Sequence, residues 1–158
     1  MGRARMWPFI ETRLAQGLAL AWGDVRYPHP LPLGSPYGER IHPVTGQLRH
    51  HDGIDIPIPR GCPVMAPWNG RVVRVDVDGI GAGAANGNCV HLTCGLWGFA
   101  FLHLDSVAVD PGEQVKGGQL LGRVGSTGLA TGPHLHLQAT LAGVLFDPAI
   151  LYPRLFIP

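Results

Sequence analysis

The sequence carries little charge. Only 15% of its 158 residues are charged, and 12 Lys and Arg residues nearly balance 11 Asp and Glu residues. This balance gives no reason to expect nucleic-acid binding. No apolar run approaches the ~20 residues of a membrane-spanning helix, so no transmembrane segment is expected. The hydrophobic content of 46% nevertheless predicts a folded chain rather than a disordered one.

Cysteine is also scarce, and its spacing fits neither a disulfide framework nor a thiolate metal site. The three cysteines, Cys62, Cys89 and Cys94, are an odd number without a CxxC pair. Cys89 and Cys94 are five residues apart and would face opposite ways in one strand. We therefore expect free, buried thiols. The HExxH helix of many zinc proteases is absent as well.

Glycine and proline are abundant, at 23 and 15 residues, which predicts few helices and many turns. Short β-branched or alternating runs between glycine turns predict an all-β domain from Ser35 onward, with a hairpin around residues 95–98. The expected strands are 54–56, 64–66, 71–77, 89–93, 99–104, 115, 120–124, 134–140 and 144–146. Many closely spaced short strands indicate a mainly β fold, an antiparallel sandwich or a partly closed barrel.

The N-terminal segment looks separate from this domain. Residues 1–30 predict a short helix beginning near Pro8, followed by a proline-rich linker, and residues 31–158 form the expected domain. Two arginines near Met1 raise the possibility of a signal peptide. Polar residues 11–13 interrupt the apolar stretch such a signal needs, so we favour a docking helix.

Two distant segments, His51-Asp52-Gly53-Ile54-Asp55 and His134-Leu135-His136, concentrate metal-ligating side chains. Residues two or four apart share one face of a strand, so each segment would present its polar pair together if extended. Gly53 would then leave room for an ion. A catalytic zinc takes three protein ligands and a water, which these segments could supply. His50 is the alternative to His51, although it would face the opposite way.

Several blocks in the same order resemble the M23 zinc metallopeptidases, the lysostaphin/LytM-type endopeptidases that cut bacterial cell-wall peptides. The blocks are residues 35–46, 51–55, 61–70, 101–104, 111–122 and 125–136, and the resemblance covers roughly residues 31–151. It implies the barrel-sandwich hybrid of that family and peptidoglycan peptides as substrate. It further implies that one zinc ion is held by His51, Asp55 and His136, with His103 and His134 beside the metal.

Physical chemistry suggests roles for the last two histidines. Hydrolysis needs a base and a donor for the developing oxyanion, and the usual zincin glutamate is missing. Histidine suits the task because its ordinary pKa is about 6.5. We assign His103 as the base and His134 as the oxyanion stabiliser, roles that could be exchanged. Tyr37 and Arg40 either line the substrate groove or brace its loop, and His42 braces that loop.

Three positions depart from the family pattern. Gln138 stands where an acid is common, Phe101 replaces a frequent tyrosine, and residues 79–87 form an unusually Gly/Ala-rich loop. None of them is a predicted metal ligand. A neutral amide at Gln138 would change the electrostatics around His136.

Two other functions fit parts of the sequence. A catalytically silent M23-fold module could bind the wall, regulate an amidase or serve as a structural virion protein. Segments 64–72 and 111–120 also resemble biotinyl or lipoyl carriers, whose modified lysine would here be Lys116, but a carrier has no use for the histidines. An active enzyme would work outside the cytoplasmic membrane, in the periplasm, secreted or delivered by a phage, yet the sequence shows no clear export signal. The sequence leaves open the scissile bond and the oligomeric state.

Overall fold

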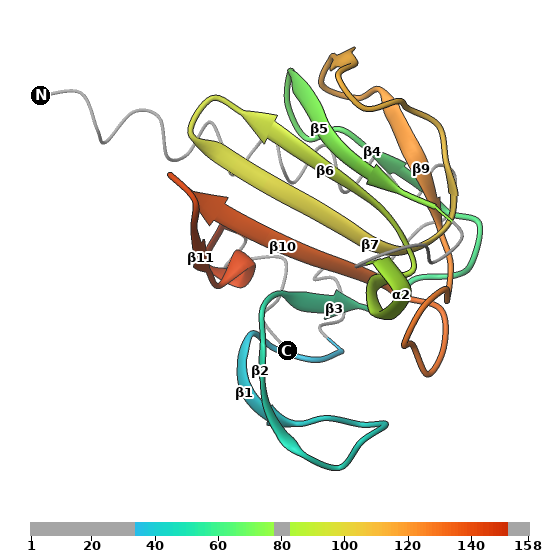
Figure 1. Ribbon diagram of the computed structural model, residues 1–158, viewed down its shortest axis with the longest axis vertical. Helices are drawn as coiled ribbons and strands as arrows, with labels where there is room; N and C mark the ends of the chain where they lie inside the picture. The colour runs from blue at the N-terminus through green and yellow to red at the C-terminus, as the bar shows by residue number, and fades with distance from the viewer. Residues whose placement is uncertain (1–33, 78–82, 152–158) are drawn as a thin grey trace, which may run out of the picture.

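Antiparallel strands make up most of the computed structural model, which describes residues 34–77 and 83–151 (Figure 1). The strands are β1 (Gly38–Ile41), β2 (Leu48–His51), β3 (Ile54–Ile56), β4 (Pro63–Met65), β5 (Gly70–Asp76), β6 (Asn88–Cys94), β7 (Trp97–Val107), β8 (Gln114–Val115), β9 (Leu120–Val124), β10 (Leu135–Leu141) and β11 (Val144–Phe146). Two single-turn helices accompany them, α2 (Gly83–Asn86) and the 3-10 helix η1 (Pro148–Leu151).

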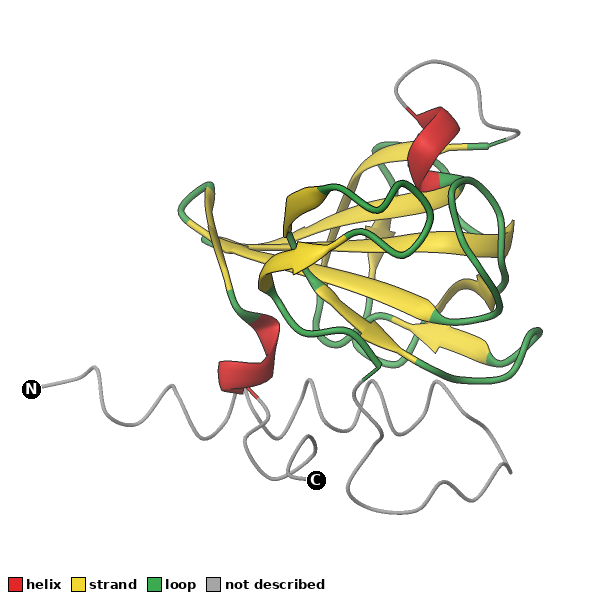
Figure 2. Cartoon of the chain, turned by 90° about the horizontal axis from the view of Figure 1, so that it is seen from below, coloured by secondary structure: helices red, strands yellow, loops and turns green. Residues whose placement is uncertain are grey.

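One large sheet organises the domain. Its strand order is β11-β10-β7-β6-β5-β8, with β3 also paired to β10 and with β9 joined to both β4 and β7. The long β7 pairs with β6 and β10 along its first part and with β9 at its end, so it links the two layers seen in Figures 1 and 2. The small β1–β2 hairpin projects from one end of the sheet (Figure 1). The predicted mainly β fold with antiparallel strands is confirmed, and its sheets are open.

Strand alternation separates an apolar core from a polar sheet face. Leu135, Leu137 and Ala139 of β10 are buried in the core, and Ile54 and Ile56 of β3 join them. The intervening residues of these two strands point to the opposite face. That outer face therefore collects the side chains of Asp55, His136 and Gln138.

Most predicted strands are present within one or two residues of their expected ends. The β1–β2 hairpin was not expected, and the Gly/Ala-rich segment contributes α2. The segment from His51 to Asp55 is not one extended strand, so the condition for its two polar residues to share a strand face is not met: β2 ends at His51 and β3 begins at Ile54. The predicted N-terminal helix and linker lie outside the described residues.

The three cysteines are free, as predicted, with Cys62 and Cys89 buried. Among the described residues, no helix has the length and apolar character needed to cross a membrane.

Candidate metal centre

Three side chains from three strands bring their ligand atoms together on the polar face. Nε2 of His51 lies 3.0 Å from Nδ1 of His136 and 3.3 Å from Oδ1 of Asp55. Nδ1 of His136 lies 2.8 Å from the same carboxylate oxygen. Asp55 and His136 are directly opposite in the β3–β10 pair, which fixes their approach. Two nitrogens and one oxygen thus converge on one point, a donor set that suits zinc.

The hydrogen positions around this point also fit a cation. Nδ1 of His51 lies 2.7 Å from the Pro36 carbonyl oxygen. A carbonyl only accepts, so Nδ1 of His51 carries the hydrogen and its Nε2 presents a lone pair to the cluster. The hydrogen on Nδ1 of His136 is then shared between two acceptors, Nε2 of His51 and Oδ1 of Asp55. A metal ion would take the place of that shared proton, with all three lone pairs already aimed at it.

Asp55 is held in its charged form. Burial raises the pKa of its carboxyl group, but the hydrogen bond from His136 and the closeness of the His51 ring hold the pKa well below its usual range. Nη2 of Arg40 lies 3.6 Å from the other carboxylate oxygen, Oδ2. An ionised, partly buried carboxylate is the form that binds a metal.

Gly53 sets the position of the His136 ring. A Cβ atom on Gly53 would collide with the Leu137 carbonyl oxygen and would lie 2.8 Å from Nε2 of His136. The glycine therefore makes room for this ligand ring rather than for the ion itself, which corrects the expectation from the sequence. On the outer side of the ring, the Gln138 side-chain amide lies 3.3 Å from Nε2 of His136. The atom that faces the ring is the amide nitrogen, which donates to Nε2 and fits a hydrogen on Nδ1. Rotation of the amide by 180° would present its oxygen, which would accept an Nε2 hydrogen and leave Nδ1 free for a metal.

We expect Gly53→Ala to destabilise the protein and to weaken metal binding, because the added methyl group displaces His136. Overpacking of this kind costs about 1–3 kcal/mol of unfolding free energy. Urea denaturation and a zinc titration measure the two effects. Gly132→Ala is the matched control, since nothing lies within 4 Å of a Cβ there. Equal unfolding free energies and equal zinc affinities in the two variants would contradict the role given to Gly53.

A bulge in β7 turns His103 toward the same face. Phe101 and Leu104 both lie in the core, so two residues occupy the space between them where strict alternation allows one. His103 takes up the extra residue with a left-handed φ of 62°, unusual for a side chain other than glycine. As a result Leu102 and His103 both line the cavity that contains the three ligands.

His103 and His134 are anchored in the same way. Nδ1 of His103 lies 2.8 Å from the Thr127 carbonyl oxygen, and Nδ1 of His134 lies 2.8 Å from that of Gly132. Each Nδ1 therefore carries a hydrogen, and each Nε2 is free to exchange a proton. The ring centroids are 4.8 Å apart, and Nε2 of His134 lies 3.5 Å from Oδ1 of Asp55. Burial lowers the pKa of His103 to about 4, so this ring is neutral at pH 7 and can accept a proton.

A cavity of about 230 Å³ opens over these groups. One wall comes from the β1–β2 hairpin through Arg40, His42 and His50, and another comes from α2 and residues 129–131. Nδ1 of His42 accepts hydrogen bonds from the backbone N–H groups of Val44 and Thr45, so this ring braces the hairpin turn. The rings of Tyr37 and His50 pack edge to face, with their centroids 4.9 Å apart. Tyr37 is not among the described residues that line the cavity. His50 is exposed and lies 3.9 Å from Asp52, outside the ligand group.

The buried histidines predict a pH-dependent stability for the metal-free protein. His103 has a pKa of about 4 when folded and about 6.5 when unfolded, so the unfolded chain binds more protons between these values. Burial lowers the pKa of His136 as well. The free energy of unfolding is therefore fully retained above pH 6.5 and falls as the pH drops toward 4, by up to roughly 3 kcal/mol for His103. The lowered pKa of Asp55 adds a further loss only below about pH 4.

Urea denaturation in a chelator at pH 7.5, 6 and 5 measures this dependence. His103→Gln should flatten it, because the substituted side chain does not titrate. A midpoint that stays constant from pH 7.5 to 5 in the unsubstituted protein would contradict the assignment of buried, neutral imidazoles.

Two positioning groups were missed by the sequence analysis. Thr127 holds His103 through its carbonyl oxygen, while its hydroxyl donates to Leu104 O and accepts from the Asn88 N–H. The Pro36 carbonyl orients His51. Both acceptors are backbone carbonyl oxygens, which every residue type has, so the sequence does not distinguish them. Only the position of Thr127 in the Gly125-Ser126-Thr127-Gly128 run could have indicated its importance.

Known proteins with similar sequences are peptidases. Residues 49–148 match the profile of Peptidase family M23. An uncharacterized metalloprotease of Haemophilus influenzae is 37% identical over 137 residues, which are 84% of this chain and 28% of that protein. The peptidoglycan DD-endopeptidase ShyC of Vibrio cholerae is 38% identical over 110 residues, which are 69% of this chain and 24% of that protein. The chain thus spans about a quarter of the length of these curated relatives.

Solved structures share the architecture. The catalytic domain of the antimicrobial peptidase lysostaphin from Staphylococcus simulans superposes with a TM-score of 0.64 at 31% identity, over 77% of this chain and 92% of that domain. A zinc-containing peptidase from Vibrio cholerae gives a TM-score of 0.65 at 31% identity, over 77% of this chain and 36% of that one.

Proposed function

The chain belongs to peptidase family M23, and we propose that it is a zinc-dependent endopeptidase that hydrolyses cross-links or stem peptides of bacterial peptidoglycan. One observation carries the proposal. The ligand atoms of His51, Asp55 and His136 converge in a cavity that also contains two anchored imidazoles, His103 and His134. A metal-binding module without catalysis would have no need of the second pair.

His51, Asp55 and His136 would hold the zinc ion. When bound, zinc supplies Lewis acidity, which polarises a carbonyl group and lowers the pKa of water from about 15.7 to near 7. The mixed nitrogen and oxygen donor set supports this metal over magnesium or calcium, which prefer oxygen alone. The zinc-containing relative from Vibrio cholerae supports the same choice.

The remaining histidines handle protons and charge. His103 is neutral and its Nδ1 is hydrogen-bonded to Thr127, so Nε2 is the atom that takes up a proton from water. Nε2 of His134 lies 3.5 Å from Oδ1 of Asp55, so the carboxylate would stabilise a proton taken up at this nitrogen. That N–H is available to the oxyanion as it develops. The geometry thus favours His103 as the base and His134 as the donor.

Peptidoglycan is the proposed substrate because the names of several relatives state it, and a further relative is named for the same class of peptidase. ShyC is named a peptidoglycan DD-endopeptidase, and the Mpg protein of Neisseria meningitidis is named a DD-carboxypeptidase/endopeptidase. Such a substrate places the activity outside the cytoplasmic membrane. Arg40 forms part of the cavity wall and is the proposed contact for the peptide, while Tyr37 braces the hairpin from behind.

Digestion of purified cell walls tests the function directly. Released amines and the masses of the released fragments are followed with the metal-stripped chain, with the zinc-restored chain and without protein. We expect fragments only after zinc is restored, and their masses identify the bond. Wall binding without cleavage by the zinc-loaded chain would instead support the silent-module alternative.

A further inference from the structure

A second group of metal-ligating side chains lies outside the candidate active site. Asp76 ends β5, and Cys89 and His91 lie on the neighbouring β6. Sγ of Cys89 lies 3.4 Å from Oδ2 of Asp76 and 3.5 Å from Nε2 of His91. These three atoms lie within 4.8 Å of one another, as in the first cluster.

The two distances from the Cys89 sulfur fit a tetrahedral site. Zinc binds sulfur at about 2.3 Å and nitrogen or oxygen at about 2.0 Å, so neighbouring ligand atoms lie about 3.3–3.6 Å apart. The two distances from the Cys89 sulfur fall in this range without any rearrangement. Three protein ligands leave a fourth position for water.

The surroundings set the protonation state of each candidate ligand. Arg74 forms an ion pair with Asp76, which lowers the pKa of that carboxyl group and fixes its orientation. Burial lowers the pKa of His91, so its ring is neutral at pH 7. Burial and the nearby Asp76 raise the pKa of the Cys89 thiol to about 11, so an ion must displace the thiol proton to bind.

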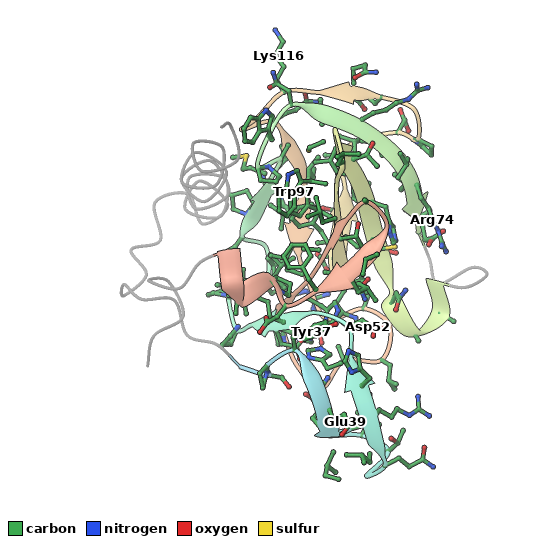
Figure 3. The ribbon with its side chains drawn as sticks, turned by 90° about the vertical axis from the view of Figure 1, so that its left-hand side faces the viewer. Tyr37, Glu39, Asp52, Arg74, Trp97 and Lys116 are labelled. Carbon is green, nitrogen blue, oxygen red and sulfur yellow. The ribbon has the colours of Figure 1, made fainter. Side chains whose placement is uncertain are left out.

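The cluster lies on the same sheet face as the active site. Asp76 is opposite Cys89 in the β5–β6 register, and Cys89 packs with Leu102 of β7. Leu102 is in turn opposite His136 in the β7–β10 register. Two strand spacings separate Cys89 from His136, or about 10 Å. Asp76 and His91 are partly exposed, and Arg74 projects outward from β5 (Figure 3), so an ion can enter from this side.

We propose that Asp76, Cys89 and His91 form a second metal site, which takes a thiolate-preferring divalent ion such as Zn²⁺. On binding, the ion forms one bond to each side chain and the thiol proton passes to solvent. The second site differs from the first in that one of its ligands is a sulfur atom. This site is independent of the peptidase activity.

Cobalt(II) is the probe, because a thiolate ligand gives a sulfur-to-cobalt charge-transfer band and the first cluster contains no sulfur. The full chain is stripped of metal, kept reduced and titrated with cobalt while the spectrum and the bound cobalt are measured. We expect two bound ions per chain and the charge-transfer band. Cys89→Ser should remove the band and one ion, whereas His136→Ala should remove one ion and keep the band.

Cys94→Ser is the matched control, because Cys94 is a partly buried cysteine on the same strand but lies outside the cluster, and it should keep the band. His91→Ala retains Cys89, and its cobalt affinity should fall at least about 10-fold at the thiolate site, since even outer partners of ligands contribute 10–100-fold. This variant keeps the test valid if Cys89→Ser misfolds. Absence of the band from the unsubstituted chain, survival of the band in Cys89→Ser, or an unchanged cobalt affinity in His91→Ala would overturn the proposal.

Discussion

His136→Ala is expected to remove the ion proposed for the first site and with it the hydrolysis of peptidoglycan. Nδ1 of this ring lies within 3.0 Å of both other ligand atoms, so its loss leaves two ligands and an open gap in the cluster. Without the metal, water keeps a pKa of about 15.7 instead of about 7, and activity should fall at least about 10³-fold. Bound zinc after dialysis should fall by one ion per chain, as measured by mass spectrometry of the metal.

His50→Ala is the control for this variant. His50 is the neighbour of a ligand, is exposed and lies outside the ligand group, so it should keep its zinc. Its ring contributes to the cavity wall, which confines any effect to substrate binding. If His50→Ala lost the ion and His136→Ala retained it, the ligand assignment would be wrong.

The core and the outer polar face could be predicted from the sequence because strand alternation is a local property. In β10 the residues alternate between Leu135, Leu137 and Ala139 on one side and His136 and Gln138 on the other. The ligand-bearing face follows from that pattern alone. The neighbours of each strand are not local, and no pattern within β10 indicates that β3 lies beside it.

The His51–Asp55 pair shows where a local rule brings the correct residues together for the wrong reason. The two side chains converge, but not as the i and i+4 residues of one strand, since β2 and β3 are separate and pair with different partners. A turn at Asp52 and Gly53 aims them at the same point. Gly53 is required there because His136 and Leu137 occupy the space that a Cβ atom would need, an arrangement formed only when the sheet assembles.

Irregular backbone accounts for the features that the sequence did not predict. The left-handed φ of His103 costs on the order of 1 kcal/mol and persists only because Thr127 and the flanking core residues hold it. The second cluster depends on a register shift between Val72 and Arg74 of β5, which aligns Asp76 with Cys89. From the sequence, Cys89 is expected only to be a free, buried thiol. Bulges and registers are set by tertiary contacts that one sequence does not display.

His103→Ala should lower kcat about 10²–10⁴-fold while the zinc content stays unchanged, because the ring moves a proton without being a ligand. His134→Ala should lower kcat by a similar factor, because it removes the group that donates to the oxyanion. The double variant should be little worse than either single variant if both rings act in one step. Wall digestion and metal analysis on the same preparations separate catalysis from metal binding.

A small added base distinguishes the two roles. Imidazole in the buffer should restore part of the activity of His103→Ala, since a free base can take the proton that Nε2 no longer accepts. It should not restore His134→Ala, where a donor must be held against the oxyanion by the Gly132 carbonyl oxygen and Asp55. Rescue of His134→Ala alone would exchange the two assignments, and full activity in both variants would refute the mechanism. The buried, neutral ring anchored at Thr127 is the one suited to accept a proton, so rescue of His103→Ala is the expected result.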